Sequence, residues 1–166
     1  AMAGKTAFYM AAGVTSHERG AYAAHPVRDT SGRIVGVAAI KKNVDAVRGI
    51  LAAYPHSFLI NSDGVVFMAG VTDMVFRSLW PVPPARAHAL KASRQFGVET
   101  FDPVFDSPVQ QGDVLRFQGE SYQCFRNPIV VPGWSLVLLM SRQEVDYFRT
   151  LGWGVTGAVS LMLVLV

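Results

Sequence analysis

The stretch RGAYAAHPVRDTSGRIVGVAAIKKNVD, residues 19–45, most constrains what this chain can fold into. Its first part, 20–27, mixes polar, aromatic and apolar residues, as half-buried strands do. The D-T-S-G run at 29–32 favours a tight reversal, because such residues bond their own backbone or accept positive φ. The run 34–40 is apolar and rich in β-branched residues, which predicts a second strand buried on both faces.

A helix is expected directly after this hairpin. Lys41 and Lys42 end the second strand, and Asn43 is suited to cap a helix. Pro55 disfavours helical geometry in the residue before it, so the helix should end there. Apolar residues recur at helical spacing between the two, and we expect them to form one face: Val44, Val47, Ile50, Leu51 and Tyr54.

The segment SFLINSDGVVFMAG, residues 57–70, repeats the pattern of an apolar strand, an Asp-Gly turn and a returning strand. Ser141 and Glu144 then form a capping-box pattern at the start of a last helix. Three more strands are expected between these segments, at 114–117, 121–128 and 134–140. Joined by tight turns, they predict an antiparallel sheet, and the chain as a whole reads as an α+β protein with two sheet modules.

Composition narrows the class of protein. Of 166 residues, 51% are hydrophobic and 16% charged. Such a composition excludes disorder and favours a membrane-linked protein. The formal charge is +3, but the basic residues are scattered, with no run beyond Lys41 and Lys42, so no nucleic-acid partner is expected. Cys124 is the only cysteine, which excludes an intrachain disulfide and a multi-cysteine metal site.

The end of the chain carries no charged residue after Arg149. A helix that spans a membrane needs roughly 20 apolar residues, and Trp153 is of a type enriched at membrane interfaces. We therefore expect 151–166 to begin a transmembrane helix. A buried C-terminal helix is the alternative.

No catalytic motif is visible. The sequence lacks G-x-S-x-G, H-E-x-x-H, a glycine-rich phosphate loop and any kinase or cyclase signature. The four histidines, at 17, 25, 56 and 88, have no metal-ligand spacing with carboxylates and are expected in loops or on the surface. We expect no catalytic residue, metal or cofactor in this segment, and the question whether the whole protein is an enzyme stays open.

One group of polar residues suits a small ligand. The run 6–14 predicts a strand that leads into a polar loop containing Thr15 and Ser16, and the hairpin places Tyr22 and Lys41 on neighbouring strands near it. Hydroxyls, backbone N–H groups and an ammonium that converge in this way would bind a small carboxylate. In the alternative, the two hydroxyls satisfy a turn, the tyrosine is core and the lysine lies in solvent.

The runs GAYAAHPVRDTSGRIVGVAAIKKNVDAV and, upstream, MAGKTAFYMAAGVTSHERG resemble the Cache sensor module of bacterial transmembrane receptors. Within that superfamily they most resemble the double-Cache, PAS-like region of DctB-like histidine kinases, which sense dicarboxylates. The resemblance covers most of residues 1–150. The order strand, D-x-x-G, strand, lysine, aspartate, helix is diagnostic as a set.

This resemblance implies a binding site for a small organic acid in the membrane-distal module. Position by position, the resemblance assigns ligand contacts to Thr15 and Ser16 in the loop G-V-T-S, to Tyr22 in the strand G-A-Y, and to Lys41 in the run A-I-K-K. Ala21 stands where such sensors often carry a second aromatic residue, a change expected to widen or weaken the pocket. The arginine-containing segment that these sensors carry just upstream is not in this chain.

The resemblance also implies a division of the chain. Residues 1–54 would be the C-terminal part of the distal module, 55–140 the membrane-proximal module, and 141–166 a signalling helix with the start of the transmembrane segment. The proximal module shows no converging polar set in the sequence and is expected to be a packed unit without a ligand. Its expected core is Trp80, Phe125, Trp134, Leu136 and Leu138.

The function expected from these observations is extracytoplasmic sensing of a small organic acid by a receptor in the inner membrane, with this region periplasmic. The receptor is expected to act as a homodimer, with a histidine kinase as its output and a diguanylate cyclase or chemoreceptor as alternatives. Two rivals come from other classes: a membrane-anchored enzyme, and a structural or partner-docking ectodomain without a ligand.

Overall fold

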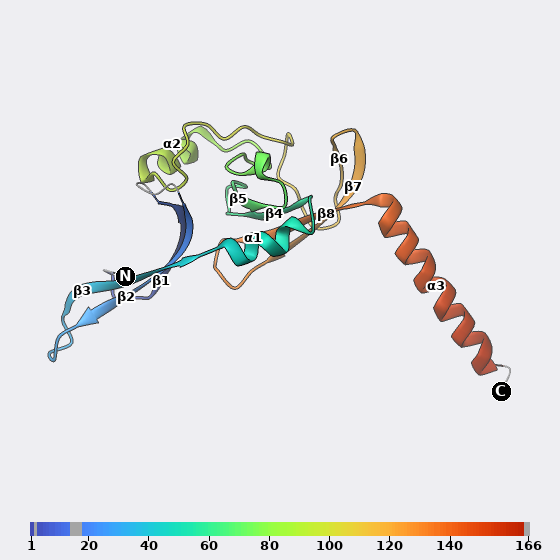
Figure 1. Cartoon of the computed structure of the whole chain (residues 1–166), viewed down its shortest axis with the longest axis horizontal. Helices are drawn as coiled ribbons and strands as arrows, with labels where there is room; N and C mark the ends of the chain where they lie inside the picture. The colour runs from blue at the N-terminus through green and yellow to red at the C-terminus, as the bar shows by residue number, and fades with distance from the viewer. Residues whose placement is uncertain (2, 14–17, 165–166) are drawn as a thin grey trace.

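The computed structural model describes residues 1, 3–13 and 18–164. Two antiparallel sheets and three α-helices follow one another along the chain (Figure 1). The elements are β1 (Ala7–Ala12), β2 (Arg19–Arg28), β3 (Ile34–Asn43), α1 (Asp45–Ala52), β4 (Ser57–Ile60), β5 (Val66–Ala69), η1 (Thr72–Met74), α2 (Pro84–Ser93), β6 (Val114–Phe117), β7 (Glu120–Pro128), β8 (Ser135–Ser141) and α3 (Arg142–Val164). The predicted α+β class is confirmed.

The first sheet has the order β1-β2-β3 and is antiparallel throughout. Its central hairpin forms as predicted, because the Asp29 carboxylate accepts hydrogen bonds from the backbone N–H of Ser31 and Arg33, each at 3.0 Å. The Ser31 hydroxyl also donates to it, and this bond is the main cause of the lowered pKa of Asp29. Gly32 takes a φ of 84°. Residues with a side chain rarely adopt that conformation.

The prediction that the strand at 34–40 is buried on both faces is wrong. Most of β3 is exposed, including Ile40, whose relative exposure is 69%. The reason is positional: β3 is an edge strand of a three-stranded sheet that extends away from the rest of the molecule (Figure 1). An apolar β-branched run indicates a strand but does not identify what covers it.

Helix α1 follows the hairpin, but its details differ from those predicted. Asn43 is the last residue of β3 instead of the cap, and the helix ends at Ala52, three residues before Pro55. Only two of the five apolar residues expected on its inner face, Val44 and Leu51, are buried. The others are exposed because only this narrow side of α1 meets the core.

The second sheet has the order β5-β4-β8-β7-β6. The predicted hairpin at 57–70 forms its first two strands, and the side-chain oxygen of Asn61 accepts from the backbone N–H of Asp63 and Val65 in the turn. Gly64 has a φ of 81°, and a Cβ there would lie 2.5 Å from the ring of Trp80. Only glycine fits this turn, because both the backbone conformation and the indole exclude a side chain.

The core predicted for residues 55–140, which contain the second sheet and are called the second unit below, is partly confirmed. Trp80 and Trp134 are buried, whereas Phe125 and Leu138 are half-buried and Leu136 is exposed. Alternation along the strands explains the difference, because the inward side chains of β7 and β8 are Tyr122, Cys124, Val137 and Leu139.

A second buried cluster joins the two sheets. Met10 of β1 packs with Phe67, Phe96 and Trp134, and Val44 and Leu51 belong to the same cluster. Polar contacts reinforce this junction: the Gln95 amide donates to the Met10 carbonyl at 2.8 Å, and the Ala12 N–H donates to the Gln95 carbonyl at 2.9 Å. The first sheet is therefore anchored to the second unit by its β1 end.

Helix α3 leaves the second sheet and projects from the body of the molecule (Figure 1). The Ser141 hydroxyl accepts from the Gln143 N–H at 3.3 Å. This bond is in keeping with the expected capping role of Ser141. Tyr147, Leu151 and Trp153 are exposed on the helix. Across the described residues, no helix is at once long enough and apolar enough to cross a membrane.

Candidate ligand-binding site

Two of the four predicted site residues meet on one face of the first sheet. Tyr22 and Lys41 are directly opposite each other on β2 and β3, so their side chains point to the same side. The Lys41 ammonium lies 6.0 Å from the centre of the Tyr22 ring. That distance is within the range of a cation–π contact. Tyr9, opposite Tyr22 on β1, extends the row. Thr15 and Ser16 lie outside the described residues.

The Lys41 ammonium has an anionic neighbour. The Glu18 carboxylate approaches it at 3.7 Å, and the side chain of Lys41 is 34% exposed while that of Glu18 is 73% exposed. An ion pair this open to water contributes little to stability, with exposed pairs typically worth about 0–1 kcal/mol.

Gly20 creates the room in which the lysine lies. A Cβ at Gly20 would be 2.6 Å from Cε of Lys41, so the aliphatic part of the lysine passes directly over the glycine. Sequence reasoning missed Gly20, Glu18 and Tyr9 as members of this site. The D-T-S-G turn fixes only the register of β2 and β3, so it gives no signal for Tyr9 on β1 or for the path of the Lys41 side chain past Gly20 to Glu18.

Lys42 and Ala21 lie on the opposite face. They are directly paired, Ala21 is opposite Met10 on the other side, and Ala21 packs against the buried cluster that contains Met10. Alternation along β3 therefore separates the two lysines between the two faces of the sheet. Ala21 does not line the face of Tyr22 and Lys41, so its effect on a pocket there would be indirect.

The face of Tyr22 and Lys41 offers groups that are able to contact an anion. It offers an ammonium with three N–H donors, a phenol ring and a second tyrosine. No cluster of three or more His, Cys, Asp or Glu that could hold a metal ion occurs within the part of the chain that the structure describes. Burial raises the pKa of the Cys124 thiol to about 11. Cys124 is therefore no candidate nucleophile, because a neutral thiol is a poor one.

Comparison with known proteins places this arrangement in context. No family model matches the chain. The chain is 26% identical over 147 residues to the C4-dicarboxylate transport sensor protein DctB of Pseudomonas aeruginosa, a match that covers 88% of this chain and 22% of that protein. The chain thus spans about a fifth of the length of this curated relative.

Solved structures share the fold. The sensor domain of the histidine kinase DctB of V. cholerae matches with a TM-score of 0.71 and 22% identity, over 85% of this chain and 57% of that one. The ligand-binding domain of the Pseudomonas aeruginosa amino acid chemoreceptor PctC, in complex with GABA, matches with a TM-score of 0.59 and 17% identity, over 84% and 57%. The resemblance inferred from the hairpin motif is confirmed: the chain is a homologue of the sensor protein DctB and has a Cache-like sensor fold.

Proposed function

We propose that this chain is the extracytoplasmic sensing region of a membrane signalling receptor and that it binds a small organic acid on the face of Tyr22 and Lys41. The observation that carries the proposal is the placement of these two side chains directly opposite each other. Homology to DctB supports small-ligand sensing, and the GABA complex of PctC supports a fold that accepts small molecules with a carboxylate.

In this proposal the ligand carboxylate replaces Glu18 as the partner of Lys41. The hydroxyls of Thr15 and Ser16 and the ring of Tyr22 complete the site. A dicarboxylate would also need a cation for its second carboxylate, and the DctB relative makes that class the first to test. The ligand therefore exchanges one weak, solvent-exposed ion pair for a charge-assisted hydrogen bond.

The domain arrangement is part of the proposal. Residues 1–54 form part of a distal module, 55–140 the proximal module, and 141–166 a signalling helix with the start of a membrane span. The exposure of both faces of β3 supports an incomplete distal sheet, as does the 57% coverage of the V. cholerae sensor domain. Apolar residues are exposed on α3, with Trp153 at 74%. They suit a membrane surface or a second copy in a homodimer.

The output is proposed as a histidine kinase in the inner membrane, with this region periplasmic. Ligand occupancy would bias two conformations of the sensing region, and α3 would carry that bias to the membrane. The likeness to PctC supports a chemoreceptor as the alternative output.

The experiment is calorimetric titration of the receptor with succinate and related acids. A charge-assisted hydrogen bond contributes roughly 1.5–3 kcal/mol, so Lys41→Ala should weaken binding about 10- to 100-fold. Lys42→Ala is the matched control, because its side chain is on the opposite face, and it should leave the affinity unchanged. Equal sensitivity of both positions would place the site elsewhere. Absence of binding by any organic or amino acid would favour the ligand-free ectodomain.

A further inference from the structure

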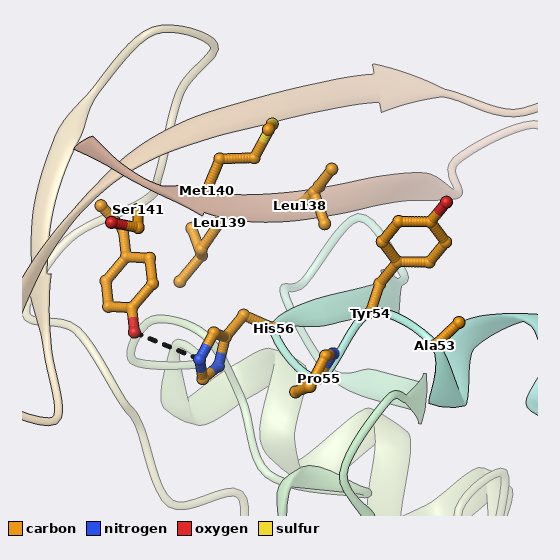
Figure 2. Close-up of a pocket in the computed structure, with 9 residues that line it drawn as sticks. Ala53, Tyr54, Pro55, His56, Leu138, Leu139, Met140 and Ser141 are labelled. Carbon is orange, nitrogen blue, oxygen red and sulfur yellow. Dashed lines mark hydrogen bonds between the residues drawn. The ribbon is translucent and has the colours of Figure 1, made fainter. Parts of the chain in front are cut away.

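A cavity of about 500 Å³ lies at one end of the central strands of the second sheet, and no residue of the first sheet is among those that line it (Figure 2). It occurs where β8 runs past the start of β4, since the last β4 pairing is Ser57 with Leu138. The nine residues that line it are Ala53, Tyr54, Pro55, His56, Tyr122, Leu138, Leu139, Met140 and Ser141. The volume lies within the range of small-molecule sites.

Three polar side chains from separate segments meet at this cavity. The Tyr122 hydroxyl and Nε2 of His56 are hydrogen-bonded at 3.2 Å, and Ser141 is directly opposite Tyr122 on the neighbouring strand. The remaining lining is apolar, mainly from Leu138, Met140 and Pro55. A mostly apolar wall with a few converging polar groups is typical of sites for small molecules.

The second ring nitrogen of His56 is unsatisfied. Its Nδ1 atom is buried and has no hydrogen-bond partner among the described residues. Buried polar atoms nearly always have a partner, so this one needs an explanation. When the Tyr122 hydroxyl donates to Nε2, the proton of the neutral ring is on Nδ1. In this tautomer Nδ1 is a donor that needs an acceptor.

We propose that this cavity is a second binding site, specific for a small monocarboxylate with a short alkyl chain. The carboxylate accepts from Nδ1 of His56 and from the Ser141 hydroxyl, while the Tyr122 hydroxyl donates to Nε2 and so keeps the proton on Nδ1. The alkyl chain lies on the apolar wall. Because Nδ1 is covered, the side chains around it must move as the ligand enters. Among the nine described residues that line the cavity none is acidic, so nothing there repels an anion.

The site lies next to the helix that leaves the module. Ser141 ends β8, and α3 begins at the following residue, so a ligand bound to Ser141 contacts the start of α3. The two sites do not depend on each other, because the first belongs to the first sheet and the second to one end of the central strands of the second sheet. Failure of one leaves the other intact.

The test uses the 166-residue chain with butyrate as the probe and 1-butanol as its uncharged match. Long-range ¹H–¹⁵N spectra resolve the imidazoles of the four histidines. Butyrate should shift the ring nitrogens of His56 and leave those of His25, on the first sheet, unchanged. Butanol should bind at least about 10-fold more weakly, the ratio expected when a charge-assisted bond is lost. Saturating succinate should not displace butyrate.

Two tyrosine variants locate the carboxylate. Tyr122→Phe removes the hydroxyl that faces His56 and should weaken butyrate about 10-fold or more. Tyr54→Phe is the control, because the Tyr54 hydroxyl in Figure 2 points away from His56, and binding should be preserved. Equal binding of butanol, an unmoved His56 signal, or equal effects of the two variants would overturn the proposal. Should Tyr122→Phe fail to fold by circular dichroism, the His56 signal of the unmodified chain decides alone.

Discussion

The two Asp-Gly hairpins of this chain have nearly the same turn but opposite surroundings. In the first, Asp29 accepts from the N–H groups two and four residues later, and in the second Asn61 does the same. The first turn is at an exposed tip, whereas Asn61 is 5% exposed and its turn packs against Trp80. The strands differ in the same way, since β4 and β5 are fully buried and β3 is mostly exposed.

This contrast separates local from tertiary causes. A side-chain oxygen that accepts two backbone N–H groups needs only the right residue at the right spacing, so the sequence is enough to form both turns. Burial needs a partner surface, which the second hairpin finds in β8, α2 and the loop around Trp80. Substitutions in the second unit should therefore lower the free energy of unfolding strongly, whereas substitutions in the first sheet should lower it little.

The largest expected effect is at Trp134, which packs edge-on against Phe67 in the cluster that joins the two sheets. Removing a buried ring of this size typically costs about 3–5 kcal/mol, so Trp134→Ala should strongly lower the free energy of unfolding. Ile40→Ala on the exposed strand is the matched control and should change it by less than about 0.5 kcal/mol. Urea denaturation measures both. A near-neutral Trp134→Ala would place the stability of the chain elsewhere.

The two turn glycines give a closer comparison, because both have positive φ. Gly64→Ala forces a Cβ to within 2.5 Å of the Trp80 ring, whereas a Cβ at Gly32 meets nothing within 4 Å. Strain from the left-handed backbone costs roughly 1–2 kcal/mol in both. Overpacking adds about 1–3 kcal/mol at Gly64 alone. The losses in free energy of unfolding, measured by thermal unfolding of the two variants, should differ by the overpacking energy at Gly64. Equal losses would show that the Trp80 ring moves aside freely.

Gln95 tests how firmly the first sheet is joined to the second unit. Gln95→Ala removes the hydrogen bond to the Met10 carbonyl. A net loss of about 1 kcal/mol is expected for one such bond. The effect should be local, with faster amide hydrogen exchange in β1 and unchanged exchange in β4 and β8. Gln143→Ala, on the exposed start of α3, serves as the control. Uniformly faster exchange throughout the chain would mean that the two units unfold as one.

Parts of the candidate site were predictable for the same reason as the turns. Once the D-T-S-G turn fixes the register, Tyr22 and Lys41 must face each other and Lys42 must point away, because side chains alternate along a strand. The roles of Glu18 and Gly20 depend on the path of the lysine side chain across its neighbours, which the pattern does not contain. The His56 cavity joins residues 56, 122 and 141, and only the order of strands in the second sheet brings these segments together.

The sequence by itself determined the strands, the two turns, the alternation of faces and the resemblance to DctB-like sensors, because these depend on residues close together in the chain. Tertiary structure alone decided that β3 is exposed, that Val44 and Leu51 are buried while Val47 and Ile50 are exposed, and that Trp134 joins the two units while Leu136 faces outward. Burial is a relation between segments far apart in sequence. An apolar run records the capacity of a strand to be covered, and the fold determines whether another surface reaches it.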